Sequence, residues 1–190
     1  VQTYDIQASL DRHVSLLRAG QAGEELDGVV KSEAVGTFSL ELKNENLTSF
    51  AMLYALNKGS ELYRIMDMYG EYYEPPGDGL IINSRMAADL HTAPGDTIEI
   101  FNAALAPEAV KIPISAVISE SLGSGCYMDI ESMQKYFNME SAANTILLKV
   151  RPGALQEVKD QLLKTSRVTY IVDTARILNG YQGMLKSMMA

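Results

Sequence analysis

Few side chains in the sequence combine the types and the spacing that catalysis needs. The two histidines, His13 and His91, stand far apart, and neither belongs to a His-x-x-x-His pair or lies beside a carboxylate of metal-site type. The single cysteine, Cys126, could be a nucleophile only with a base and an electropositive setting beside it, and its flank instead predicts a small buried residue on a strand. We therefore expect no catalytic, cofactor-binding or metal-binding residue, although a hydrolase using Cys126 or a serine with His91 is one hypothesis to test.

The sequence also lacks nucleotide-binding loops and a basic character. Neither G-x-x-x-x-G-K-[ST] nor a G-x-G-x-x-G after a strand is present. Its 24 acidic residues outnumber its 16 basic ones, giving a net charge of −8, which disfavours nucleic acid as a partner because phosphate binding needs a basic face. No apolar run approaches the roughly 20 residues that cross a bilayer. The chain begins at Val1 and stops inside a helical pattern, so we expect an excerpt of a longer protein.

A group of tyrosines is the candidate contact surface. Tyrosine buries a large area and keeps a polar hydroxyl, so clustered tyrosines favour binding surfaces. The alternative is that these side chains pack the junction between two lobes. The group stands just before Pro75-Pro76 and consists of Tyr63, Tyr69, Tyr72 and Tyr73.

The elements that position these residues follow from hydrophobic periodicity. Period-two alternation predicts strands, and apolar residues at i, i+3 and i+7 predict helices. At the ends of the chain we expect strands over 4–10, 29–42, 50–56, 144–150 and 168–172. We expect helices over 13–26, over 60–66 after a Ser60 cap, over 129–137 after an Asp129 cap, from Pro152 onward, and over 174–190 with Ile177, Leu178, Tyr181, Leu185 and Met188.

The middle of the chain is rich in glycine and proline and is mostly strand. Strands over 80–82, 97–101 and 110–118 surround a short helix over 84–90. The chain is therefore predicted to be α+β, with a porter-like split βαβ (ferredoxin-like) lobe and an inserted small β-rich lobe. The first lobe is predicted to comprise residues 1–70 and 128–190, and the inserted lobe residues 71–127.

Several segments, taken in order, resemble the extracytoplasmic domains of MacB/FtsX-like ABC-transporter permeases. The sharpest is a glycine, a buried strand, a short helix with alanines, and then Gly-Asp before another strand, which covers residues 77–90 and 94–100. His91-Thr92-Ala93 departs from the family's glycine and apolar residues at that turn. The resemblance covers nearly the whole chain and also includes Tyr4-Asp5-Ile6, residues 127–133, the strand over 146–150 and Arg151-Pro152-Gly153.

The resemblance implies a transport component of the cell membrane, with this chain on the extracytoplasmic side. Such a domain transmits conformational change or handles cargo and catalyses nothing itself. The implied partners are a second permease copy or a paralogue, a cytoplasmic ATPase subunit, and an extracytoplasmic protein or a lipid-like or peptide cargo. It also implies that both ends of the chain lie on the side facing the membrane, with the final helix as a lever.

Two other functions fit the same residues. One keeps the family and makes the domain an extracytoplasmic signalling module that regulates a cell-wall hydrolase or a sensor partner. The other abandons the resemblance and makes the chain a cytosolic ligand-binding domain with ferredoxin-like repeats. Membrane spans before Val1 and after Ala190 in the parent protein would exclude the cytosolic alternative.

Overall fold

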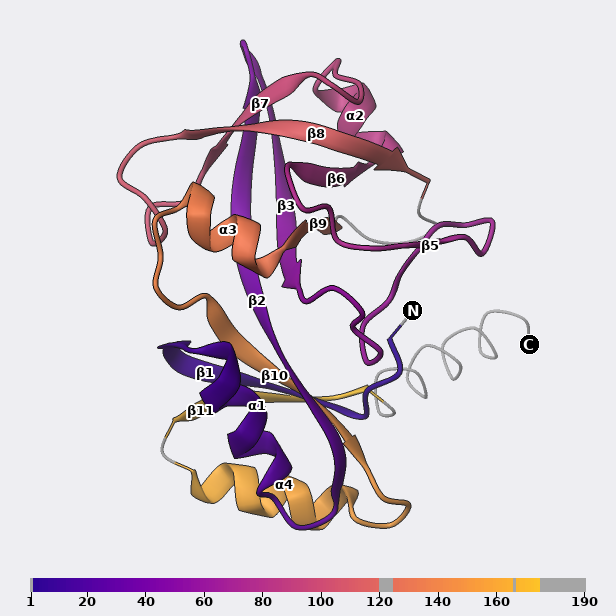
Figure 1. The fold of residues 1–190 in the computed structure, drawn as a ribbon, viewed down its shortest axis with the longest axis vertical. Helices are drawn as coiled ribbons and strands as arrows, with labels where there is room; N and C mark the ends of the chain where they lie inside the picture. The colour runs from indigo at the N-terminus through magenta and orange to yellow at the C-terminus, as the bar shows by residue number, and fades with distance from the viewer. Residues whose placement is uncertain (1, 120–124, 166, 175–190) are drawn as a thin grey trace, which may run out of the picture.

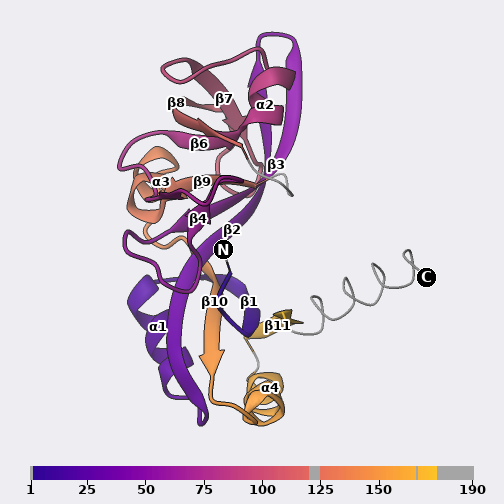
Figure 2. The ribbon, with the colours of Figure 1, turned by 90° about the vertical axis from the view of Figure 1, so that its right-hand side faces the viewer.

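One long strand, β2 (Val29–Asn44), runs through both halves of the molecule (Figures 1 and 2). The computed structural model describes residues 2–119, 125–165 and 167–174. The first part of β2 pairs antiparallel with β10 (Ala143–Val150), and its second part pairs antiparallel with β3 (Leu47–Leu56). The nine-stranded sheet has the order β11-β1-β10-β2-β3-β9-β6-β8-β7.

The half at the β11 end of this sheet is a split βαβ repeat. Strand β1 (Ile6–Val14) leads through α1 (Leu16–Glu24) to β2, and β10 leads through α4 (Leu155–Lys164) to β11 (Val168–Asp173). Strand β10 lies between β1 and β2, and β1 lies between β10 and β11, all antiparallel. This order confirms the predicted α+β class and its split βαβ lobe.

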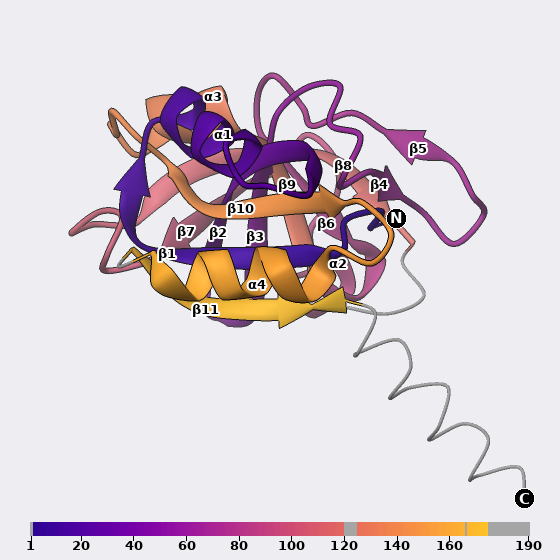
Figure 3. The same cartoon turned by 90° about the horizontal axis from the view of Figure 1, so that it is seen from below.

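Alternating small and branched side chains build the core of the split βαβ half. One face of its strands carries Ile6, Ala8, Ile146 and Leu148, all buried. Residues of both helices pack on this face, and Figure 3 shows α1 and α4 from that end of the molecule. The period-two pattern therefore directs these side chains toward the helices and leaves the polar side chains on the opposite face.

The other half closes into a small barrel. Strands β6 (Leu80–Asn83), β7 (Thr97–Phe101), β8 (Val110–Ile118) and β9 (Gly125–Asp129) extend the sheet from β3. Strand β7 then pairs back with residues 41–43 of β2, so β2-β3-β9-β6-β8-β7 form a closed ring. Closure removes unpaired strand edges from this half.

The barrel interior holds the larger hydrophobic core. Helices α2 (Ser84–Asp89) and α3 (Ile130–Tyr136) contribute Met86 and Met133 to it. Asn83 caps α2 by accepting from the Met86 N–H at 2.8 Å, and Asp129 caps α3, as predicted, by accepting from the Ser132 N–H at 3.1 Å. The large strand residues buried in this core include Leu40, Leu42, Leu53, Leu80, Ile82, Ile98, Ile100 and Ile112.

The predicted helix over 60–66 is wrong. Ser60 does accept a hydrogen bond from the Tyr63 N–H, but the chain then forms a strand, β4 (Ile65–Met66), that pairs with β5 (Tyr72–Tyr73). Ile65 is buried at the junction between the two halves. That burial and the pairing with β5 outweigh the local cap signal, which cannot by itself extend a helix.

The two described ends of the chain lie close together. The Thr174 N–H donates to the Asp5 carbonyl at 3.0 Å, and Gln2 forms a bridge with Tyr63. In Figure 1 this region lies at the right of the molecule, away from α2 and β7. The predicted helix over 174–190, including Ile177, Leu178, Tyr181, Leu185 and Met188, lies outside the described residues apart from Thr174.

The lobe boundaries at 70/71 and 127/128 stay a prediction. The packing groups the second part of β2 and most of β3 with strands β6 to β8, because their side chains share one buried cluster inside the barrel, whereas Leu56 of β3 belongs to the cluster at the junction. The turn at His91-Thr92-Ala93 is well formed, with His91 at φ +49° directly after α2. Asp96 stabilises that turn by accepting from the Ala93 N–H at 2.8 Å.

Candidate functional site

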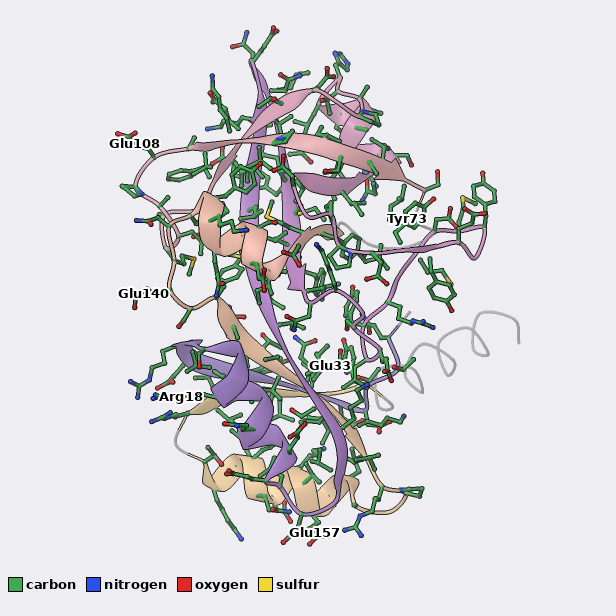
Figure 4. The ribbon with its side chains drawn as sticks, in the orientation of Figure 1. Arg18, Glu33, Tyr73, Glu108, Glu140 and Glu157 are labelled. Carbon is green, nitrogen blue, oxygen red and sulfur yellow. The ribbon has the colours of Figure 1, made fainter. Side chains whose placement is uncertain are left out.

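The four tyrosines of the candidate contact surface lie in two different environments. Tyr63 is buried, with 7% of its surface exposed, whereas Tyr69 and Tyr72 are 78% and 56% exposed. Tyr73 is half-buried on β5, and Figure 4 labels it on the hairpin formed by β4 and β5. The structure therefore brings Tyr69, Tyr72 and Tyr73 together on one hairpin and places Tyr63 beneath it.

Tyr63 packs the junction between the two halves. Its ring centroid lies 4.9 Å from that of Tyr54, 6.1 Å from that of Tyr127 and 6.4 Å from that of Tyr4. Tyr54 belongs to β3, Tyr127 belongs to β9, and Tyr4 lies two residues before β1. Burial, together with the neighbouring Tyr54 hydroxyl, raises the pKa of Tyr4 and of Tyr63 well above the usual value, so both stay neutral.

Asp67 holds the loop between β4 and β5 in a defined shape. Its Oδ1 accepts from the N–H groups of Tyr69 and Glu71, both at 2.9 Å, and its Oδ2 accepts from the Tyr73 hydroxyl at 3.1 Å. Desolvation opposes ionisation, but these hydrogen bonds prevail and lower the pKa of Asp67. Gly70, at φ +89°, supplies the left-handed residue that this tight loop needs.

The outer side of this hairpin is apolar and aromatic. Met68 is 57% exposed beside Tyr69, and its N–H is anchored to the Ser119 carbonyl at 2.7 Å. The guanidinium of Arg64 lies over the Tyr72 ring, 4.7 Å from its centroid. The sequence did not single out Arg64, because residues 60–66 were predicted to be a helix and the pairing of Arg64 with Tyr72 depends on the hairpin.

A second exposed apolar surface lies on the outer wall of the barrel. It is a shallow groove of about 500 Å³ in which Phe50 and Met52 of β3 stand exposed. Alternation along residues 50–56 could have placed Phe50 and Met52 outward, since Ala51 and Leu53 are buried. The groove is lined by Ser39, Leu40, Glu41, Phe50, Ala51, Met52, Phe101, Asn102, Ala103 and Ala104.

Polar side chains tie the junction together. Glu33 of β2, labelled in Figure 4, accepts from the Ser60 hydroxyl and from the N–H groups of Glu61, at 2.9 Å, and Leu62, at 3.2 Å. Asp5 accepts from Lys149 Nζ at 3.0 Å and from the Val150 N–H at 2.9 Å. The loop before the hairpin is thus fixed to the strand that joins both halves.

Cys126 and His91, the residues considered for catalysis, lie in different environments. Cys126 is fully buried on β9 inside the barrel, with its Sγ 3.7 Å from the Met52 carbonyl, which confirms the prediction of a small buried residue. His91 is exposed in the turn after α2, and the side chain of His13 lies outside the described part. Among the residues that the structure describes, no three His, Cys, Asp or Glu side chains converge as metal ligands. Within the same residues, no helix is both long and apolar enough to span a bilayer.

The fold is that of extracytoplasmic domains of ABC-type transporters, as the sequence resemblance implied. No protein-family model matches the sequence, and no curated protein matches it. The periplasmic region of MacB from Actinobacillus actinomycetemcomitans superposes with a TM-score of 0.55 and 11% identity, over 96% of this chain and 94% of that one. The extracellular domain of the noncanonic ABC-type transporter YknZ from Gram-positive bacteria gives 0.52 and 16%, over 95% of both chains.

Proposed function

We propose that this chain is the extracytoplasmic domain of an ABC-transporter permease. The observation that carries the proposal is the extent of the structural match, which covers about 95% of this chain and of both transporter domains. A split βαβ unit by itself occurs with many functions. The match covers nearly the whole chain, so it includes the barrel as well as that unit.

The proposed role is mechanical. Thr174, the last described residue, is bonded to Asp5, which directly precedes β1, so movement of the segments before β1 and after β11 would enter the domain at these two neighbouring strands. Those strands are bonded through β10 to β2, which continues into the barrel. A displacement at the ends would therefore reach the barrel through backbone hydrogen bonds rather than through a loose linker. In the parent complex, a cytoplasmic ATPase subunit would drive the displacement.

Thiol labelling in intact cells tests on which side of the membrane the domain lies. Cys126 is the only cysteine of the chain and is buried, so the native chain gives a low background. Asn46→Cys, at the exposed tip between β2 and β3, supplies a reactive site. We expect a membrane-impermeant maleimide to label this variant of the parent protein in intact cells. Labelling only after permeabilisation would contradict the proposal and favour the cytosolic ligand-binding alternative.

Deleting the domain from the parent protein distinguishes a role in transport from a role in signalling. If the domain is a transport component, deleting it from the parent should abolish export while a cell-wall hydrolase or sensor partner keeps its activity. If it is a signalling module, the partner should lose regulation. An ATPase assay of the purified full-length complex, with and without the domain, tests whether the complex still assembles. Retained ATPase activity without export would mean that the coupling between ATP hydrolysis and transport is lost.

A further inference from the structure

The most concentrated exposed apolar surface on the described chain is the hairpin of β4 and β5. Three large side chains, Met68, Tyr69 and Tyr72, are each more than half exposed there, within a short stretch of chain. We call these three residues the β4–β5 tip. The hairpin extends from the side of the molecule in Figures 1 and 3, so a partner can reach it without meeting the barrel or the split βαβ half. Isolated exposed apolar residues are common, but a group of them on a projecting element is typical of a contact site.

The tip is held in shape before any partner arrives. The carboxylate of Asp67 fixes the backbone at Tyr69 and Glu71 and also binds the Tyr73 hydroxyl. The Met68 N–H is bonded to the carbonyl of Ser119, directly after β8, and Arg64 covers one face of the Tyr72 ring. An ordered loop loses little conformational entropy on binding, so its exposed side chains contribute more of their contact energy to affinity.

The charge around the tip decides which partner it suits. Residues 64–73, which comprise the hairpin, contain one basic residue, Arg64, and two acidic residues, Asp67 and Glu71, a net charge of −1. The flanking residues 58–63 and 74–78 add Lys58, Glu61, Glu74 and Asp78, and Asp78 accepts from the Tyr136 hydroxyl. Glu61 is paired with Lys31 at 2.6 Å, and Glu74 accepts from the Gly59 N–H at 2.9 Å. Glu71 is exposed and adjoins the tip, and no ion pair to its carboxylate occurs within the described residues.

We infer that the β4–β5 tip docks a basic segment of another protein. A Lys or Arg side chain of that segment lies against the ring of Tyr69 or the open face of Tyr72, with its charge near Glu71. The apolar part of the same segment covers Met68, whose flexible side chain adapts to the partner. This inference does not depend on whether the domain belongs to a permease, because it needs only the exposed hairpin and its charge.

The same charges argue against two other occupants. An anionic lipid surface is repelled by an acidic loop, since membrane-surface binding relies on Lys and Arg. A second copy of this chain carries the same net charge of −8 and presents the same acidic hairpin. Like charges across an interface weaken association, so self-docking at the tip is disfavoured.

Titration of the isotope-labelled chain with synthetic peptides tests the inference by NMR. The probes are a peptide of alternating arginine and leucine and its matched control, in which glutamate replaces arginine. We expect the arginine peptide to shift amide signals of residues 64–73, and Tyr69→Ser with Tyr72→Ser to weaken its binding about tenfold. Tyr170→Ser, which removes a 64% exposed tyrosine on β11, is the matched control and should bind like the native chain.

Charge and occupant are tested by three further measurements. Glu71→Lys should weaken the arginine peptide several-fold, and the effect should diminish at high salt. Vesicles containing anionic lipid should not bind the chain, and sedimentation should show no dimer that Tyr69→Ser and Tyr72→Ser disrupt. Shifts spread over the whole acidic surface, equal binding of the glutamate peptide, or tip-dependent binding to vesicles or to a second copy would each overturn the inference. Unchanged spectra of the variants outside the hairpin show that they are folded.

Discussion

Asn144→Ala should destabilise the chain at the point where β2 changes partners. The last pair between β10 and β2 is Thr145 with Val35, and the first pair between β2 and β3 is Gly36 with Ala55. On the β10 side of β2, no residue is registered as a strand partner between Val35 and Glu41, where the pairing with β7 begins. The side chain of Asn144 takes that place, because its Oδ1 accepts from the Thr37 N–H and its Nδ2 donates to the Thr37 carbonyl, both at 2.8 Å.

The expected cost of Asn144→Ala is about 2 kcal/mol. Each of the two amide hydrogen bonds contributes roughly 1 kcal/mol net, and both Asn144 and Thr37 are half-buried, so water can partly replace the lost partner. Two matched variants scale this figure. Asn57→Ala removes one bond, from Nδ2 to the Ala34 carbonyl at 3.1 Å, and should cost about half as much. Asn144→Asp keeps the acceptor but sets a carboxylate oxygen against the Thr37 carbonyl, so it should cost at least as much as Asn144→Ala.

Urea unfolding followed by circular dichroism measures these differences, because the chain has no tryptophan to report on the junction. We expect the midpoint to fall at an unchanged slope, and Tm to fall by about 4–8 °C for a chain of this size. A loss below about 0.5 kcal/mol for Asn144→Ala would refute the reasoning that its amide substitutes for a strand. So would a loss no larger than that of Asn57→Ala.

Three further outcomes follow from burial and titration. Leu40→Ala, in the barrel core, should lower the free energy of unfolding in urea by about 3 kcal/mol, whereas Leu163→Ala, exposed on α4, should lower it by less than about 0.5 kcal/mol. Equal losses of stability would contradict the assigned core. Hydrogen bonds lower the pKa of Asp67 below its usual 3.8, so the order of the hairpin should persist above that pH and be lost as the pH falls through the lowered pKa. Amide exchange of the loop measures this pH dependence, and Asp67→Asn should remove it. Burial raises the pKa of Tyr4 and Tyr63 above the usual 10.0, so the stability of the chain should decline as the pH rises beyond 10. In a titration followed by tyrosinate absorbance, replacing either residue by phenylalanine should remove one ionisation at high pH.

Local patterns were enough to predict most of the strands and helices. Residues 29–42 were predicted to be one extended stretch, whose end, residues 38–42, alternates between apolar and polar side chains, and Asp129 correctly predicted the helix that it caps. The same kind of local signal misled at Ser60. A serine that can cap a helix looks the same in sequence as one held by a distant carboxylate, and Glu33, which binds the following N–H groups, is far away along the chain.

The tyrosines show where sequence reasoning reached its limit. The prediction treated four tyrosines as one group because they are close in the chain, namely Tyr63, Tyr69, Tyr72 and Tyr73. Their exposure depends on which of them meets the rings of Tyr4, Tyr54 and Tyr127, which come from distant segments. No spacing rule within the group encodes that choice. Whether the exposed members form a binding surface stays a prediction for the peptide titrations.

By itself, the sequence determined the α+β class, the split βαβ repeat at the two ends and the absence of a nucleotide loop, since these depend on periodicity and on short motifs. Only the tertiary structure decided that β7 returns to β2 and closes the barrel, and that β2 serves both halves. Strand pairing over long sequence separations depends on the fit of whole faces of side chains, which no local window contains. For the same reason, the hairpin that carries Tyr69 and Tyr72 depends on the pairing of β4 with β5 and on the burial of Ile65 at the junction, neither of which a local pattern encodes.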